Sequence, residues 1–308
     1  MPSRVFLSSG DMIADRRFEF ARDLQSQGDL VAAADLMLQA TDLAPNFASA
    51  WFTLGEIRVL LGEQDEAITA FRHARASDPS DRHGAKVRLM RLGVEQLTAM
   101  PQAYVRSLFD QYALRFDDEL VGRLHYLGPA LLFQAVLSVR AAQRGPAFFK
   151  RAIDLGCGTG LAAAAFAGNV DAFTGIDLSP RMIEQARAGG FYTELEVDDI
   201  VAGLRKRPDA CADLVLAADV MVYVGELAAV LSEVQRVLAP GGLLAFTVET
   251  HDGEGVVLGK GLRYAHGAEY VRDQMAAAGL ALTYLEAASP RSEDELPVTG
   301  LVVVAAKT

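Results

Sequence analysis

The sequence is poor in several features that define particular classes of protein. It has only two cysteines, Cys157 and Cys211, in 308 residues. Both lie in apolar, strand-like surroundings, which predicts buried thiols in a reducing compartment rather than a disulfide framework. No apolar run reaches the twenty or so residues of a transmembrane helix, and the apolar part of Met1–Gly10 is too short for a secretory signal. We therefore expect a cytoplasmic protein that does not bind membranes.

Positive charge is also scarce, because 29 lysines and arginines face 40 aspartates and glutamates, for a formal net charge of −11. This balance argues against a nucleic-acid-binding surface. No cluster of histidines and acids has metal-ligand spacing, so no metal site is predicted. The apolar share of 51% and the charged share of 22% are ordinary for a folded protein. The length fits about two domains.

The first hundred residues have a helical pattern that contains a repeat. Gly28-Asp29-Leu30 recurs as Gly62-Glu63-Gln64, and Leu43-Ala44-Pro45-Asn46 recurs as Ser77-Asp78-Pro79-Ser80, both at an offset of 34 residues. That offset is the period of the tetratricopeptide repeat. The second copy resembles this family closely at Trp51, Leu54, Gly55, Ala67, Phe71 and Pro79. It departs at Arg58, where the family has tyrosine, and the first copy is degenerate.

This resemblance leaves two roles open for residues 1–100, about two repeats followed by a capping helix at 81–97. The domain either offers a groove to a protein partner or packs on the next domain or on a second subunit. Since about three repeats make a self-standing array, two repeats make a poor groove. Residues 101–149 are expected to be a linker and a lid, and residues 150–308 a catalytic domain.

Residues 153–160, Ile-Asp-Leu-Gly-Cys-Gly-Thr-Gly, join an apolar strand to an alanine-rich helix. Glycines allow a tight turn and the close approach of a ligand, and this order predicts a nucleotide-type pocket at the carboxyl end of a parallel sheet. The dinucleotide fingerprint needs a third glycine where Leu161 stands. Asp154 would also repel a pyrophosphate. An acid there suits a ligand with a positive group, and S-adenosylmethionine carries an ammonium and a sulfonium.

Strand-like and helix-like segments alternate after this turn. They predict a mostly parallel sheet that is covered on both faces. The expected strands are 172–178, 193–200, 212–218, 243–249, 281–287 and 299–306, and the expected helices are 180–188, capped by Ser179, 226–238, ended by Pro240-Gly241-Gly242, and 268–278.

Acids stand at the ends of successive strands. Asp177 ends the second strand, where a carboxylate can accept hydrogen bonds from the ribose hydroxyls. Asp198-Asp199-Ile200 ends the third strand, where a carboxylate suits the adenine amino group and the Ile200 N–H suits the ring. Asp219 ends the fourth strand, beneath the expected methyl-transfer centre.

Together with the Val237–Gly242 turn, these motifs resemble the class I methyltransferases that use S-adenosylmethionine and have a seven-stranded Rossmann-like domain. The whole chain resembles bacterial tetratricopeptide-repeat methyltransferases. The resemblance implies S-adenosylmethionine as cofactor and S-adenosylhomocysteine as product. It implies these cofactor residues: Asp154, Gly156, Cys157, Gly158, Gly160, Asp177, Leu178, Met182, Asp199, Ile200 and Asp219. Asp199 is preferred to Asp198 because it aligns better with the family acid.

The stretch Phe109–Pro129 mixes aromatic and acidic residues without a clean helical stripe. It resembles the Phe-Asp-x-Tyr-Ala-x-x-(Phe/Tyr)-Asp segment that precedes the catalytic domain in many methyltransferases and folds over the cofactor. By that resemblance Tyr112 is a cofactor contact and Tyr126 a lid or substrate contact. The alternative is that both rings only pack an interface.

Methyl transfer depends mainly on positioning and the exclusion of water, but a hydroxyl acceptor also needs a base near neutral pKa, for which histidine is suited. His251 and His266 are therefore the candidate catalytic residues. Either one is equally an ordinary loop residue. Tyr223 and Arg263 are candidate substrate residues, since Arg263 can pair with a carboxylate or phosphate.

Absent motifs narrow the acceptor. Asp219-Val220-Met221-Val222 stands where methyltransferases of DNA bases or of glutamine carry Asn-Pro-Pro-Tyr. The leading reading is a methyltransferase that acts on an oxygen or nitrogen of a small molecule. The alternatives are a protein methyltransferase that recruits its substrate through the repeat and a non-catalytic scaffold that binds S-adenosylmethionine.

Overall fold

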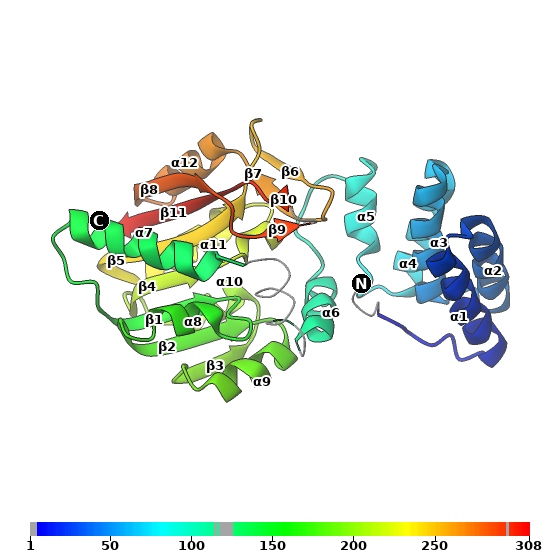
Figure 1. Cartoon of the computed structure of the whole chain (residues 1–308), viewed down its shortest axis with the longest axis horizontal. Coiled ribbons are helices and arrows are strands. Elements are labelled where there is room, and N and C mark those ends of the chain that lie inside the picture. Colours follow the sequence, from blue (N-terminus) through cyan, green and yellow to red (C-terminus); the bar gives the residue numbers. More distant parts are fainter. Residues whose placement is uncertain (1–4, 114–115, 117–125, 294–295) are drawn as a thin grey trace. The chain divides into compact units, whose positions relative to one another are not determined.

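The computed structural model describes residues 5–113, 116, 126–293 and 296–308. Its internal contacts divide the chain into two compact units, Met1–Gln111 and Tyr112–Thr308. Most of the expected lid, residues 117–125 together with 114 and 115, lies outside the described residues. Each unit is described by itself (Figure 1).

The N-terminal unit is built from helices that pack as antiparallel hairpins. α1 packs on α2, α2 on α3, and α3 on α4. Gly28 and Gly62 end α1 and α3 in the left-handed conformation, at φ 87° and 80°, which glycine adopts without a Cβ penalty. The same turn therefore recurs one period apart. The helices are α1 (Met12–Gln27), α2 (Leu30–Leu43), α3 (Ala48–Leu61), α4 (Gln64–Ser77), α5 (Ala85–Arg91) and α6 (Gln102–Tyr112).

Close packing within the second hairpin depends on Gly55. A Cβ at this position would lie 2.6 Å from the ring of Phe71, which is fully buried. The absence of a side chain on α3 thus lets α4 approach. The helix expected at 81–97 is shorter, because α5 spans only Ala85–Arg91. The stretch predicted to lack a helical stripe begins inside a helix, since α6 runs to Tyr112.

The C-terminal unit contains a sheet whose main path is β3-β2-β1-β4-β5-β11-β8. The first five strands of this path pair in parallel, and β11 runs in the opposite direction between β5 and β8, pairing antiparallel with both. This confirms the prediction of a Rossmann-like, mostly parallel sheet. The strands are β1 (Phe149–Leu155), β2 (Val170–Asp177), β3 (Glu194–Val197), β4 (Ala212–Ala217), β5 (Leu238–Glu249), β6 (Val256–Leu258), β7 (Tyr264–His266), β8 (Leu280–Ala288) and β11 (Gly300–Lys307), with β9 (Ser292–Glu293) pairing β10 (Leu296–Pro297).

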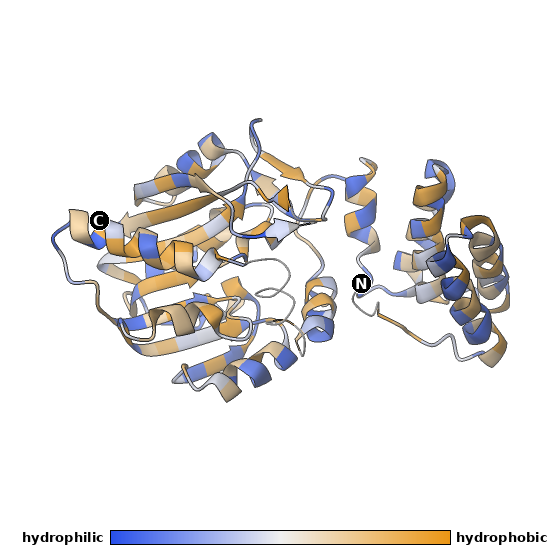
Figure 2. Cartoon of the chain, in the orientation of Figure 1, coloured by the Kyte–Doolittle hydropathy of each residue, from blue (hydrophilic) through white to orange (hydrophobic). Residues whose placement is uncertain are grey.

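Helices cover both faces of this sheet (Figure 1). α7 (Gly128–Ala142) and α8 (Leu161–Phe166) share one apolar core with the strands, and α9 (Pro180–Gly189) packs on β2 and β3. α10 (Ile200–Arg205), α11 (Ala228–Val237) and α12 (Ala268–Ala277) share the core of the other face. Figure 2 shows the hydrophobic residues gathered along β5 and β11, inside these layers.

Two strand boundaries and four short strands differ from the sequence prediction. Pro240-Gly241-Gly242 is not a turn before β5 but part of it, where the register with β4 shifts between Ala212 and Leu214. β3 ends at Val197 rather than at residue 200, because Asp199 accepts hydrogen bonds from the N–H groups of Val201 and Ala202 and starts α10. The short strands β6, β7, β9 and β10 were not predicted, since strands of two or three residues give no periodic pattern.

Candidate functional site

The glycine turn follows β1 at the carboxyl edge of the sheet. Gly156, Gly158 and Gly160 have φ values of 58°, 53° and 101°, in the left-handed region that favours glycine. A Cβ on Gly156 would lie 2.5 Å from Cγ2 of Val220. Gly160 starts α8. The turn is therefore a backbone cradle that tolerates no side chain at its first position.

Asp177, at the end of β2, binds this turn. Its Oδ2 accepts a hydrogen bond from the Gly158 N–H (2.9 Å), and its Oδ1 accepts one from the Ser179 N–H (2.8 Å). The carboxylate is only 7% exposed. Asp177 thus links the turn after β1 to the start of α9. A ribose was predicted to bind at this edge of the sheet.

Asp154 lies at the end of β1, 1% exposed. Its Oδ2 accepts a hydrogen bond from the hydroxyl of Tyr192 (2.6 Å). Burial raises the pKa of Asp154 to about 7, the Tyr192 hydrogen bond lowers it, and the neighbouring Asp177 raises it. Cys157, in the turn, is also buried, and burial raises the pKa of its thiol. Two close, buried carboxylates make this edge electronegative.

The remaining predicted cofactor residues occupy different environments. Leu178, after β2, is half-buried, whereas Met182 is fully buried in α9 and donates its N–H to Ser179 Oγ (3.1 Å). Asp199 caps α10, and Ile200 is the first residue of that helix. Asp198 instead pairs with Lys206 (2.6 Å) on the exposed side. Of the two acids, Asp198 is therefore held by a surface ion pair and Asp199 by backbone N–H groups.

A second cluster lies at the ends of β4 and β5 around a buried arginine. Arg291 is 2% exposed, and its guanidinium donates to Asp219 Oδ1 (2.5 Å) and to Glu249 Oε1. Asp219 has a φ of 59°, and its N–H donates to Thr247 Oγ1 (2.9 Å). Burial raises the pKa of Glu249, and Arg291 opposes that shift. One cation thus holds the carboxylates of two adjacent strands.

The predicted substrate residues surround this cluster. Arg263 Nε donates to the hydroxyl of Tyr223 (3.4 Å), and Arg263 Nη1 lies 3.7 Å from Glu249 Oε1. Burial raises the pKa of Tyr126 well above its usual value, and the charges of Asp219 and Asp154 raise it further. Tyr126 therefore faces both clusters. Tyr112, half-buried at the end of α6, belongs to the same unit.

The two candidate histidines differ in burial. His251 follows β5, where its Nδ1 accepts from the Gly253 N–H (3.1 Å) and its Nε2 lies 3.3 Å from the Gly255 carbonyl. His266 is fully buried in β7, and its Nε2 donates to the Val224 carbonyl (2.9 Å). Burial lowers the pKa of His266 to about 4. His266 is thus a neutral donor at neutral pH, and only His251 lies partly exposed.

The sequence motifs did not identify Tyr192 and Arg291 as residues of the site. Tyr192 is 38 residues from Asp154, and Arg291 is 72 residues from Asp219 and 42 from Glu249. Neither belongs to a local motif, so only the tertiary fold reveals their partners. Among the described residues, no group of three or more histidine, cysteine or acidic residues is arranged to hold a metal ion. None of the helices in the described part of the chain is long and apolar enough to cross a membrane.

The C-terminal unit is similar to known proteins. Residues 153–246 match the family model of the "Methyltransferase domain". Methyltransferase-like protein 27 of Homo sapiens is 30% identical over 173 residues, which cover 56% of this chain and 66% of that protein. The ubiquinone biosynthesis O-methyltransferase of Xylella fastidiosa (strain 9a5c) is 31% identical over 123 residues, 38% of this chain and 50% of that protein.

A solved structure is also similar. It is Burkholderia thailandensis 1,6-didemethyltoxoflavin-N1-methyltransferase with bound 1,6-didemethyltoxoflavin and S-adenosylhomocysteine. The TM-score is 0.51 at 19% identity, over 70% of this chain and 93% of that one. The chain therefore carries a methyltransferase domain with the fold of the S-adenosylmethionine-dependent class. The cofactor of that class is S-adenosylmethionine. The chain spans only 66% and 50% of the two sequence relatives.

Proposed function

We propose that this protein transfers a methyl group from S-adenosylmethionine to an oxygen or nitrogen atom of a small molecule. The observation that carries the proposal is the glycine turn with Asp154 and Asp177 buried beside it. A turn without side chains admits a nucleoside against the backbone, and two buried carboxylates favour a cationic ligand. We further propose a reducing, cytoplasmic location, which the free thiols of Cys157 and Cys211 fit.

The described residues support specific roles in this reaction. Asp177 and Asp199, at the ends of β2 and β3, suit the ribose and the adenine of the donor. Asp219 and Glu249, at the ends of β4 and β5, line the side where an acceptor would meet the methyl group. Attack proceeds in line with the departing sulfur, so the main task of the protein is to orient both partners and exclude water.

For the acceptor side we propose Tyr126, Tyr223 and Arg263 as contacts. His251 is the better candidate for a general base, because His266 is buried and donates its proton to a carbonyl. The names of the relatives include an O-methyltransferase of ubiquinone biosynthesis and an N1-methyltransferase of a toxoflavin precursor. These names support a small-molecule acceptor that is methylated at oxygen or nitrogen.

The test is calorimetric titration of the full chain with S-adenosylmethionine, S-adenosylhomocysteine and NAD. We expect both sulfur ligands to bind and NAD not to bind. Gly156→Ala should abolish binding, since the new Cβ meets Val220 at 2.5 Å, whereas Gly168→Ala, with open space around it, should bind normally. Binding of NAD but not of S-adenosylmethionine would refute the proposal. Incubation of cofactor labelled on its methyl group with small-molecule and protein fractions then identifies the acceptor class.

We also propose that the helical unit is a degenerate tetratricopeptide repeat. Support comes from the recurrence of the same cap geometry after 34 residues: Gly28 and Gly62 share one conformation, and Ala44 and Asp78 share another, with φ −133° at both. Tetratricopeptide repeats have this period. The proposed role of the helical unit is contact with a partner protein or with a second copy of the chain.

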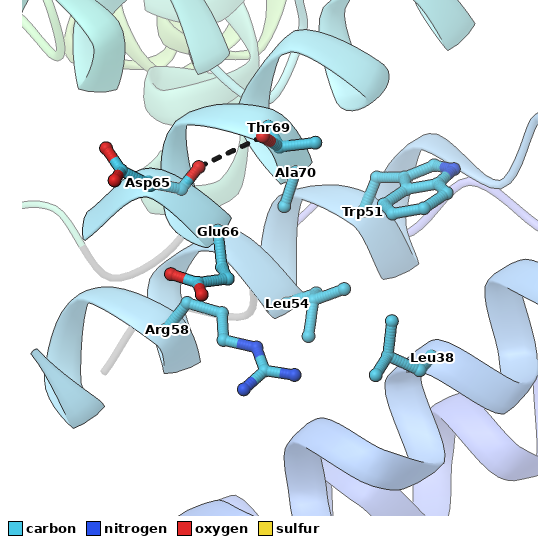
Figure 3. A pocket seen from close by; sticks show the side chains of 8 residues that line it. All are labelled: Leu38, Trp51, Leu54, Arg58, Asp65, Glu66, Thr69 and Ala70. Atoms are coloured by element: carbon cyan, nitrogen blue, oxygen red, sulfur yellow. Dashed lines mark hydrogen bonds between the residues drawn. The ribbon is translucent and has the colours of Figure 1, made fainter. Parts of the chain in front are cut away.

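One feature of this unit favours the alternative of a protein acceptor. A pocket of about 450 Å³ opens between α2, α3 and α4. Figure 3 shows Trp51, Leu38 and Leu54 on one side of it and the charged side chains of Arg58 and Glu66 on the other. If a protein is the acceptor, label should appear in the protein fraction and fall with Glu66→Ala but not with Glu269→Ala, an exposed site on α12.

A further inference from the structure

Tyr192 occupies a site that the chain has shaped for its ring. It follows α9 and lies against the strand pair β1 and β2, where Asp154 stands opposite Gly175. A Cβ on Gly175 would lie 2.9 Å from the Tyr192 ring, and one on Gly160 would lie 3.1 Å from it. Two glycines thus make room for this ring beneath the turn. Phe173 packs its ring against Tyr192 at a centroid distance of 6.0 Å.

The ring position brings the hydroxyl of Tyr192 to Asp154. The O–H donates to Asp154 Oδ2 at 2.6 Å, within the range of a charge-assisted hydrogen bond. Burial and the charges of Asp154 and Cys157 raise the pKa of Tyr192, so its hydroxyl keeps its proton and remains a donor. Within the described residues, no lysine or arginine forms an ion pair with Asp154.

The groups that face Asp154 come from several elements. Asp177 at the end of β2 and the Cys157 thiol in the turn act on it electrostatically, as does Tyr126, before α7. Leu216 of β4, the other strand neighbour, is apolar. These neighbours, like the protonated hydroxyl of Tyr192, bring negative or neutral groups. A cation that enters the turn therefore meets a carboxyl group with which no lysine or arginine of the described residues is paired.

We propose that Tyr192 is a positioning residue that holds the Asp154 carboxylate under the glycine turn, so that binding of a cationic group of the methyl donor is coupled to release of a proton from Asp154. This inference rests on the proposed function. The carboxylic acid loses its proton to solvent, and the carboxylate remains beside the cation.

The proposal has a defined pH dependence. A ligand cation stabilises only the ionised form of Asp154, whose pKa is about 7. Affinity for S-adenosylmethionine should thus rise by up to tenfold per pH unit below pH 7 and level off above it. S-adenosylhomocysteine keeps the ammonium but lacks the sulfonium, so the pH dependence of its affinity shows which cation Asp154 meets: an equal dependence indicates the ammonium and a smaller one the sulfonium. Tyr192→Phe removes a hydrogen bond to the ionised form and raises the pKa of Asp154, which weakens donor binding by about tenfold at pH 7.

The experiment is calorimetry on the full chain at pH 6, 7, 8 and 9, in two buffers of different ionisation enthalpy, which counts the protons released. We expect proton release with S-adenosylmethionine, and none with Asp154→Asn. The defect of Tyr192→Phe should shrink at pH 9. Tyr284→Phe is the matched control, because that hydroxyl also donates to a carboxylate, Glu286 (2.7 Å), but on exposed β8.

Two results would overturn the inference while leaving the proposed function standing. One is a weakening of donor binding by Tyr192→Phe that is the same at every pH, which indicates a purely structural role. The other is donor binding to the wild type without proton release. If neither ligand binds the wild type at any pH, the proposed function fails and this inference fails with it.

Discussion

Replacing Arg291 by methionine should destabilise the methyltransferase domain more than any other single arginine change described here. Methionine keeps an unbranched apolar stem but removes the charge. Asp219 and Glu249 then remain at the ends of β4 and β5 without the guanidinium that holds both. Their carboxylates face each other in a region where Arg291 was 2% exposed.

The size of the loss follows from burial. Removal of one partner from a buried ion pair costs about 3–5 kcal/mol when the other charge stays buried and uncompensated. The loss for Arg291→Met should lie toward the lower end of this range, because Arg263 remains 3.7 Å from Glu249. Burial already raises the pKa of Glu249, and loss of the cation raises it further. An acid whose pKa is higher in the folded than in the unfolded state destabilises the fold at pH values above its pKa in the unfolded state. This destabilisation disappears as the pH falls and the group becomes protonated. The defect should thus be full at pH 7.5 and smaller at pH 5, by about 1.4 kcal/mol per pH unit over the window in which the pKa of Glu249 is shifted.

The assay is urea unfolding followed by two probes. Far-UV circular dichroism reports on both units, whereas fluorescence of Trp51, the single tryptophan, reports on the N-terminal unit. Arg291→Met should shift the circular dichroism transition. Arg272→Met is the control, since its pair with Glu269 (3.4 Å) is exposed and contributes about 0–1 kcal/mol. A loss below about 1 kcal/mol for Arg291→Met, or an equal loss at both pH values, would refute the reasoning.

Three further predictions concern other positions. The pKa of His266 is lowered from 6.5 to about 4, so the free energy of unfolding should fall by about 3 kcal/mol as the pH drops from 6.5 to 4. NMR titration should show no protonation of His266 above pH 5.5, and His266→Gln should remove this pH dependence of stability. Gly55→Ala should cost the N-terminal unit about 1–3 kcal/mol by overpacking against Phe71, with partial recovery in Gly55→Ala/Phe71→Leu, followed by Trp51 fluorescence. Asp199→Ala should cost about 0.5–2 kcal/mol through the lost cap of α10, whereas Asp199→Asn, which keeps a capping oxygen, should keep the melting temperature; a melting loss as large in Asp199→Asn would contradict the capping role.

The parts of the fold that the sequence predicted are those with local causes. The glycine turn, the cap of α9 by Ser179 and the alternation of strands with helices each depend on residues close in the chain. Their order sets a mostly parallel sheet, which the structure confirms. The predicted lengths of β3 and β5 were wrong. β3 ends early because Asp199 caps α10, and β5 starts early because its first residue pairs with β4.

The candidate site was predictable only in part for the same reason. Asp154, Asp177 and Asp219 stand at the carboxyl ends of parallel strands, so their convergence follows from topology. The side chains that hydrogen-bond to these acids cannot be deduced from the topology. Nothing near Tyr192 or Arg291 in the chain distinguishes them from an ordinary surface tyrosine or loop arginine.

The sequence by itself determined the class of the C-terminal unit and the chemistry of its ligand, because both depend on short-range spacing of glycines and acids. The tertiary structure decided how the acids are held. It gave Asp154 a tyrosine hydroxyl, Asp219 and Glu249 a shared guanidinium, and His266 a buried carbonyl. Such contacts join residues dozens of positions apart, and only packing of the whole domain brings them within hydrogen-bond distance.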